Sequence, residues 1–82
     1  MQNRKVIVVL QRGWVVLGTL VSETPDKVTL ENTSVIRIWG TTKGLGEIAA
    51  NGPTKNTILD PCGTVEFHPQ TSIMTIVCTF DN

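Results

Sequence analysis

The sequence has few of the residues that metal binding uses. It contains one histidine and two cysteines among 82 residues. His68 has no second histidine near it, and Cys62 and Cys78 are not in a CxxC motif, so no ligand set has the spacing of a tetrahedral zinc site. Disulfide frameworks of small secreted domains use four or more cysteines, so both thiols are expected to be free. We predict no metal and no cofactor.

Residues arranged for catalysis are also scarce. A covalent mechanism needs a nucleophile within reach of a base, and acid–base catalysis needs paired groups. His68 lies between Phe67 and Pro69 at an expected strand end, which is typical of an exposed turn residue, and the seven acidic residues are scattered singly. The sequence therefore predicts a protein that is not an enzyme.

Charge of one sign and long hydrophobic runs are lacking as well. Seven basic residues balance seven acidic ones, which disfavours a general nucleic-acid coat. The apolar run after Arg4 and Lys5 covers only 6–10, whereas a signal peptide needs about 7 to 15 apolar residues and a membrane span about 20. These absences predict a cytoplasmic protein that does not contact a membrane.

What the sequence does contain is β-branched residues, since valine, isoleucine and threonine make up 29 of its 82 residues. Such side chains fit a pleated sheet better than a helix. We predict a mainly β protein with a single domain over 1–82, folded as a small antiparallel β-barrel or sandwich of about six strands. The expected strands are 5–10, 14–22, 28–30, 35–39, 64–68 and 72–80.

The segments between these strands carry their own signals. Proline and aspartate in 23–27 predict a hairpin turn. The polar residues 31–34 predict an interruption or a bulge, and 54–63, with two prolines, predicts a long connection. One short helix is expected at about 44–51, too short to be stable unless Leu45 and Ile48 pack on the sheet.

Three of the expected strands, 5–10, 14–22 and 72–80, are apolar on both faces. Antiparallel sheets usually leave one face polar, so a second cover is needed. The helix covers part of one face, and another subunit is the natural cover for the rest. We therefore predict a homo-oligomer.

The segment 39–46 has the composition of an anion site. Glycine backbone amides, threonine hydroxyls and a lysine precede the expected helix, whose free N–H groups favour an anion, and a tryptophan offers a surface for a base. The structural alternative is that a threonine caps the helix, the glycines permit a tight turn and the tryptophan packs in the core. The predicted ligand-binding residues are Trp14, Arg37, Trp39, Thr41, Thr42, Lys43, Gly44 and Lys55.

Several short motifs resemble those of a family of small, mostly uncharacterised β-rich proteins encoded by bacteriophages and prophages. The motifs are Gly18-Thr19-Leu20, Val28-Thr29-Leu30, Arg37-Ile38-Trp39, Leu45-Gly46-Glu47-Ile48-Ala49 and Gly52, and the resemblance covers about residues 8–78. It implies a viral protein in the cytoplasm of a bacterial host cell. Because small phage proteins without a catalytic centre often act by binding, it also suggests by analogy an anti-defence sponge for host nucleotide signals.

Three functions follow, in order of preference. The first is an oligomeric binding protein that sequesters a phosphorylated nucleotide or cyclic nucleotide. The second is a phage protein-interaction module that inhibits or adapts a host or virion protein through an exposed β-edge or apolar face. The third is a single-stranded nucleic-acid binder that stacks bases on Trp14 and Trp39, which the balanced charge disfavours.

Overall fold

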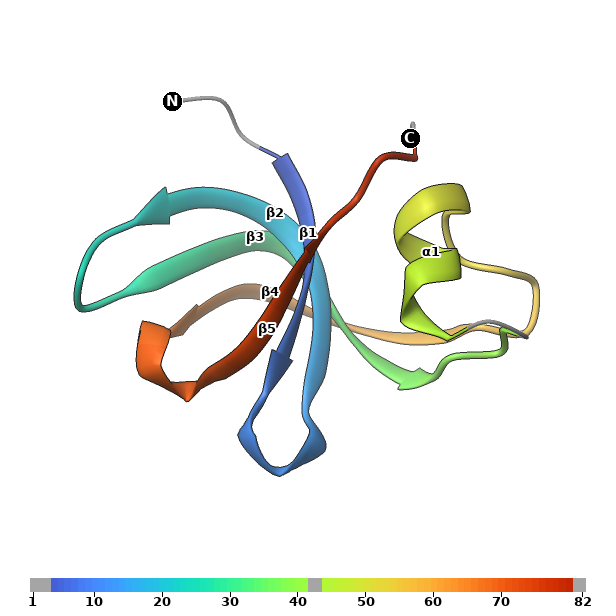
Figure 1. Ribbon diagram of the computed structural model, residues 1–82, viewed down its shortest axis with the longest axis horizontal. Helices are drawn as coiled ribbons and strands as arrows, with labels where there is room; N and C mark the ends of the chain where they lie inside the picture. Colours follow the sequence, from blue (N-terminus) through green and yellow to red (C-terminus); the bar gives the residue numbers. More distant parts are fainter. Residues whose placement is uncertain (1–3, 42–43, 81–82) are drawn as a thin grey trace.

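The computed structural model describes residues 4–41 and 44–80 and shows one antiparallel sheet with a short helix (Figure 1). The elements are β1 (Arg4–Leu10), a 3₁₀ turn η1 (Gln11–Gly13), β2 (Val15–Glu23), β3 (Val28–Ile38), α1 (Leu45–Asn51), β4 (Ile58–Phe67), η2 (Pro69–Thr71) and β5 (Ser72–Val77). The five strands follow the order β4-β3-β2-β1-β5. The predicted mainly β fold with one short helix is confirmed.

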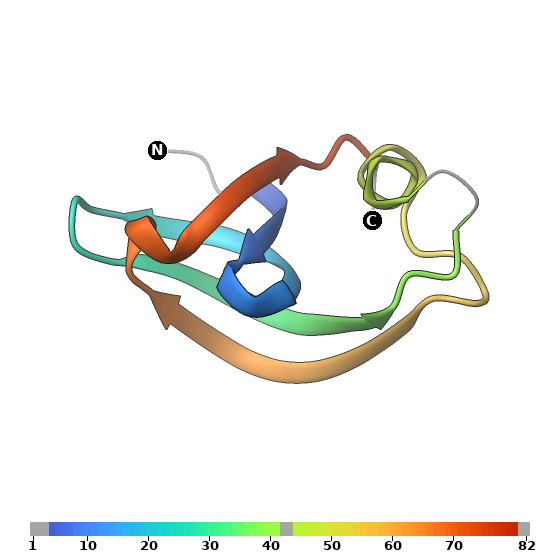
Figure 2. The same cartoon turned by 60° about the horizontal axis from the view of Figure 1, so that its bottom comes forward.

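The sheet is strongly curled but does not close. Figure 2 shows β4 and β5 on opposite sides of the curl, joined at one end by η2. They are the two ends of the strand order, and each pairs with one neighbour, β4 with β3 and β5 with β1. The described residues therefore form an open, curled sheet with two free edges rather than a barrel.

Two apolar clusters lie on the two faces of β1. The cluster on the helix side consists of Ile7, Val15, Leu17, Ile36, Leu45, Ile48 and Ala49. The cluster on the opposite side consists of Val6, Val8, Val16, Leu20, Val28 and Leu30. The helix covers the first and the curl of the sheet covers the second. One chain thus buries both faces of β1 without a second subunit. Among the three strands expected to need a second cover, only β5 leaves several large apolar side chains exposed.

The helix α1 is stabilised by its buried apolar face and by hydrogen bonds at its C-terminal end. Leu45, Ile48 and Ala49 are buried against β1 and β5, as the spacing of the apolar residues predicts. Gly52, with a φ of 86°, ends the helix and donates its N–H to the carbonyl of Ile48 at 2.7 Å. Thr79, just beyond β5, donates its N–H to the carbonyl of Ala49 at 2.7 Å. These bonds and contacts stabilise a helix that is too short to be stable alone.

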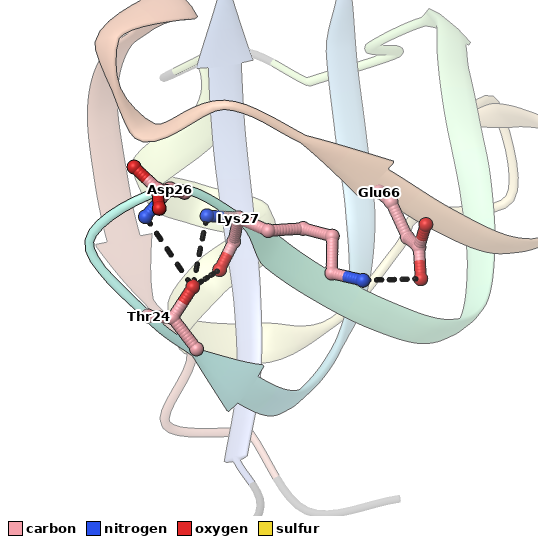
Figure 3. Close-up of polar contacts among 4 residues, drawn as sticks. All are labelled: Thr24, Asp26, Lys27 and Glu66. Carbon is pink, nitrogen blue, oxygen red and sulfur yellow. Dashed lines mark hydrogen bonds and ion pairs between the residues drawn. The ribbon is translucent and has the colours of Figure 1, made fainter.

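The predicted hairpin at 23–27 is confirmed. The hydroxyl of Thr24 accepts the N–H groups of Asp26 at 3.3 Å and Lys27 at 3.0 Å and donates to the carbonyl of Lys27 at 3.2 Å (Figure 3). Lys27 also pairs with Glu66 of β4, with 3.5 Å between Nζ and Oε2. A side-chain turn of this kind sets the register of β2 on β3 locally.

The segments 28–30 and 35–39 are one strand, β3, rather than two. Its pairing with β2 and β4 shifts register around 31–34, where Asn32 has a φ of 50°. This bulge buries Thr33, which is 1% exposed, in the space that the missing side chain of Gly18 leaves open. The polar stretch therefore bends the strand without ending it.

The prediction of a connection over 54–63 is wrong for its second half, because β4 begins at Ile58. Proline and glycine argue against a central strand, but β4 is an edge strand. On its outer side the described chain has no further strand that would need the N–H that Pro61 lacks. At the other end of the chain, β5 ends at Val77 rather than at residue 80.

Thr33 provides a stability test of this bulge. Its hydroxyl oxygen is buried and has no hydrogen-bond partner among the described residues. We expect Thr33→Val, which keeps the shape and removes the unpaired hydroxyl, to raise the free energy of unfolding by about 1 kcal/mol. Thr33→Ser is the matched control, because it keeps the hydroxyl and loses the methyl group, and it should lower the same quantity. Urea unfolding measures both, and a valine variant less stable than wild type would contradict the prediction.

Candidate functional site

The structure brings two of the predicted ligand-binding residues, Trp14 and Arg37, to the same hollow. Val16 of β2 pairs with Val35 of β3, so continuing that register by two residues places Trp14 opposite Arg37. The hollow, which we call the Trp14 pocket, has a volume of about 470 Å³. Its lining residues are Arg12, Gly13, Trp14, Val15, Val35, Ile36, Arg37 and Asp60.

Arg37 is oriented by an ion pair with β4. Its Nε lies 2.8 Å from Oδ2 of Asp60, and its Nη2 lies 3.5 Å from Oδ1. The two side chains are 59% and 51% exposed, so the pair contributes little to stability. Its role is geometric, because a forked contact holds the guanidinium plane and leaves the N–H groups that Asp60 does not use available to another acceptor.

Arg12 lies on the turn between β1 and β2 in a conformation that non-glycine residues seldom adopt. Its φ is 66°, next to Gly13 at 81°, and the N–H of Leu10 donates to the carbonyl of Trp14 at 2.7 Å across the turn. The Arg12 side chain is exposed and has no hydrogen bond or ion pair within the described part of the chain. The backbone of this turn therefore places Arg12, with a guanidinium that has no partner among the described residues, in the lining of the Trp14 pocket, at a cost in backbone energy.

The residues of the Trp14 pocket are complementary to a small anion that carries an aromatic group. Trp14 is 58% exposed, the highest value among the described aromatic residues, so its indole is accessible for stacking. Two arginines against one aspartate leave a net positive charge beside the indole. Stacking on an aromatic ring and forked hydrogen bonds to phosphate are the usual means of holding a nucleotide.

The residues predicted before the helix have mainly structural contacts. The hydroxyl of Thr41 accepts the N–H of Gly44 at 2.9 Å, which closes the turn into α1. Thr57 donates its hydroxyl to the carbonyl of Trp39 at 2.6 Å, and Thr54 donates to that of Gly40 at 2.7 Å. These contacts tie 39–41 to 54–57, and Gly44 at positive φ permits the turn into α1, as the structural alternative predicts. The rest of that alternative is wrong, because Gly44 rather than a threonine is the N-cap of α1, and Trp39 is partly exposed instead of packed in the core.

The remaining predicted residues do not join the Trp14 pocket. Trp39 is 43% exposed beside Gly44, which has a φ of 84° and precedes α1. Lys55 is exposed in the turn that follows α1. Thr42 and Lys43 lie outside the described residues, so their part in the predicted anion site stays a prediction.

Sequence reasoning missed Arg12 and Asp60 as site residues. Both were interpreted as turn residues, and the assumed break at 31–34 separated Arg37 from the hairpin. The available signal was the hairpin at 23–27, because counting outward from it along two strands places Trp14 opposite Arg37, and the two register shifts between β2 and β3 cancel. Asp60 had no comparable signal, because it pairs with Val35 from β4, in a segment that was predicted to be a connection.

The two cysteines are free and differ in their surroundings. Cys62 is exposed, whereas burial raises the pKa of the Cys78 thiol, an effect that the nearby Lys5 ammonium partly opposes. Because the thiolate is the nucleophile, we expect the Cys78→Ser variant to be alkylated about tenfold faster at mildly alkaline pH than the Cys62→Ser variant. Iodoacetamide labelling followed by mass spectrometry measures both rates, and equal rates would contradict the burial of Cys78.

Comparisons with known proteins add no further assignment. No family model matches the chain, and a search of curated proteins finds no match. Within residues 4–41 and 44–80, no helix has the length and apolar character that crossing a membrane requires. No three side chains of the described histidines, cysteines, aspartates and glutamates gather as a metal site would need.

Proposed function

We propose that the protein binds a phosphorylated nucleotide-type small molecule at the Trp14 pocket and acts by sequestering it rather than by catalysis. The observation that carries this proposal is the placement of an exposed indole beside two arginines, one of which has no partner among the described residues. The base stacks on Trp14, and the phosphate accepts hydrogen bonds from Arg12 and Arg37.

The dimensions and charge of the pocket support this ligand class. A volume of about 470 Å³ falls within the range of roughly 300 to 1,000 Å³ that small-molecule sites occupy. Asp60 limits the positive charge, which favours a small ligand with few phosphates over a polyanionic strand. By analogy with the bacteriophage proteins that the sequence resembles, the ligand would be a signal of the bacterial host.

The turn that carries Arg12 supports a binding role in another way. A non-glycine residue at positive φ costs about 1 kcal/mol relative to glycine, and such costs are concentrated at functional sites. Glycine at position 12 would remove that cost together with the guanidinium. This backbone cost supports a contact between Arg12 and a ligand that is absent in the free protein.

Isothermal titration calorimetry and tryptophan fluorescence against a panel of mono-, di- and cyclic nucleotides test the proposal. We expect Arg12→Gly to weaken binding about tenfold or more while the free energy of unfolding stays equal or rises. Trp14→Leu should weaken binding by at least as much, because stacking contributes about 1–3 kcal/mol per base.

Two control variants distinguish binding at the Trp14 pocket from binding at the segments on either side of α1. Trp39→Leu changes the other tryptophan, and Lys55→Gln removes another exposed cation. Both should leave the affinity unchanged. Loss of binding in these variants but not in the Trp14 and Arg12 variants would move the site to 39–55, and no heat or fluorescence change with any nucleotide would overturn the function.

A further inference from the structure

The two free edges of the sheet differ in how well they are protected against pairing with another strand. β4 carries Pro61, which has no N–H, and the exposed charges of Asp60 and Glu66. Prolines and charges on an edge strand are common devices against edge-to-edge association. β5 has neither, because no residue from 69 to 80 is charged and no proline follows Pro69.

The backbone groups of β5 that face outward can be identified from the pairing with β1. Cys78 donates its N–H to the carbonyl of Lys5 at 3.0 Å, one residue beyond the paired Val77 and Val6. Directly opposed residues in an antiparallel pair alternate between bonded and non-bonded. Ile76 therefore bonds to β1 like Cys78, while Thr75 and Val77 direct their N–H and C=O groups to the open edge.

The strand β5, whose outer backbone groups are unpaired among the described residues, also carries exposed apolar side chains. Ile73 is 67% exposed, Met74 49% and Val77 47%, so β5 holds three of the six large apolar residues that the described chain leaves exposed. Ile73 is the unpaired residue at the register shift opposite Val9 and Leu10. Thr75 and Val77 also line a cavity of about 230 Å³ whose other lining residues include Val6, Val8 and Leu30.

We infer that β5 pairs with β5 of a second copy of this chain, antiparallel about a two-fold axis at Thr75. The strand is self-complementary in this arrangement. Thr75 lies opposite Thr75 of the second copy, and Val77 lies opposite Ile73, so exposed β-branched residues meet on both sides of the axis. Neutrality from 69 to 80 means that the two edges approach without charge repulsion.

The contact is small. Stable dimers bury about 1,200 to 2,000 Å², and a pair of six-residue edge strands buries less, so we expect a dimer that forms in the micromolar range and dissociates on dilution. This inference does not rest on the nucleotide site, because none of the β5 residues lines the Trp14 pocket.

Sedimentation velocity over about 1 μM to about 1 mM tests the dimer. Ile73→Lys should raise its dissociation constant about tenfold or more, because each copy then places a lysine at the pairing edge. Thr64→Lys on the exposed edge of β4 is the matched control and should leave the dimer unchanged. Circular dichroism checks that both variants fold.

A cross-link tests the position of the axis without adding charge. In a Cys62→Ser, Cys78→Ser background, Thr75→Cys places two thiols on opposed residues whose Cα atoms are about 5.5 Å apart, within the range of a disulfide. Mild oxidation should give a covalent dimer from this variant and none from Thr64→Cys.

Other outcomes overturn the inference. A monomer of 9.0 kDa at every concentration excludes the contact. Weakening by Thr64→Lys, cross-linking through Thr64→Cys, or growth beyond a dimer would indicate that β5 pairs with β4 of the next copy instead. If Ile73→Lys does not fold, the Thr75→Cys cross-link decides the question.

Discussion

Ile48→Ala is expected to lower the free energy of unfolding by about 2–5 kcal/mol. Ile48 is 0% exposed and lies in the cluster that joins α1 to the helix-side face of β1. A domain of this size has about 4–12 kcal/mol of stability in total, so this loss is a large share of it. A helix of seven residues has little stability of its own, so the variant should lose α1 as well as the buried contact.

Urea unfolding monitored by circular dichroism measures this loss, and Ile38→Ala is the matched control. Ile38, at the end of β3, is 46% exposed, so the same chemical change there should alter the free energy of unfolding by about 0.5 kcal/mol or less. Equal losses in the two variants would contradict the role of Ile48 in holding the helix on the sheet.

Gly18→Ala is expected to lower the free energy of unfolding by about 1–3 kcal/mol, although alanine is normally a mild change. A Cβ atom on Gly18 would lie 2.7 Å from Oγ1 of Thr33 and 3.2 Å from Cβ of Leu30. Leu30 and Thr33 are almost fully buried, so neither can move into solvent. The alanine must therefore push β3 away from β2 at the bulge.

A double-mutant cycle isolates this contact. Thr33→Ala removes the hydroxyl that an added Cβ would strike, so Gly18→Ala should cost less in that background than in the wild type, and the two changes should not be additive. Gly46→Ala is a control for glycine replacement as such, because an added Cβ there meets no atom within 4 Å. Strict additivity of Gly18→Ala and Thr33→Ala would contradict the proposed packing of Thr33 on Gly18.

The parts of the fold predicted most accurately depend on local chemistry. The hairpin at 23–27 follows from the preference of proline and aspartate for turns, and α1 follows from the helical spacing of Leu45, Ile48 and Ala49. The site was predicted less completely. Trp14 and Arg37 were named from their chemistry, but their placement at one pocket depends on pairing β2 with β3 outward from the hairpin, which requires that 28–38 be a single strand.

The sequence by itself determined that the chain is mainly β, that it has one short helix, and that few residues are available for catalysis or metal binding, because composition and short-range periodicity are properties of neighbouring residues. Only the tertiary structure decided that 28–38 is one bent strand over Gly18, that Ile58 begins an edge strand, and that β5 is the less protected edge. Each of these features depends on which strands become neighbours. A strand's tolerance for a proline, a bulge or an exposed isoleucine is set by what lies beside it in the sheet.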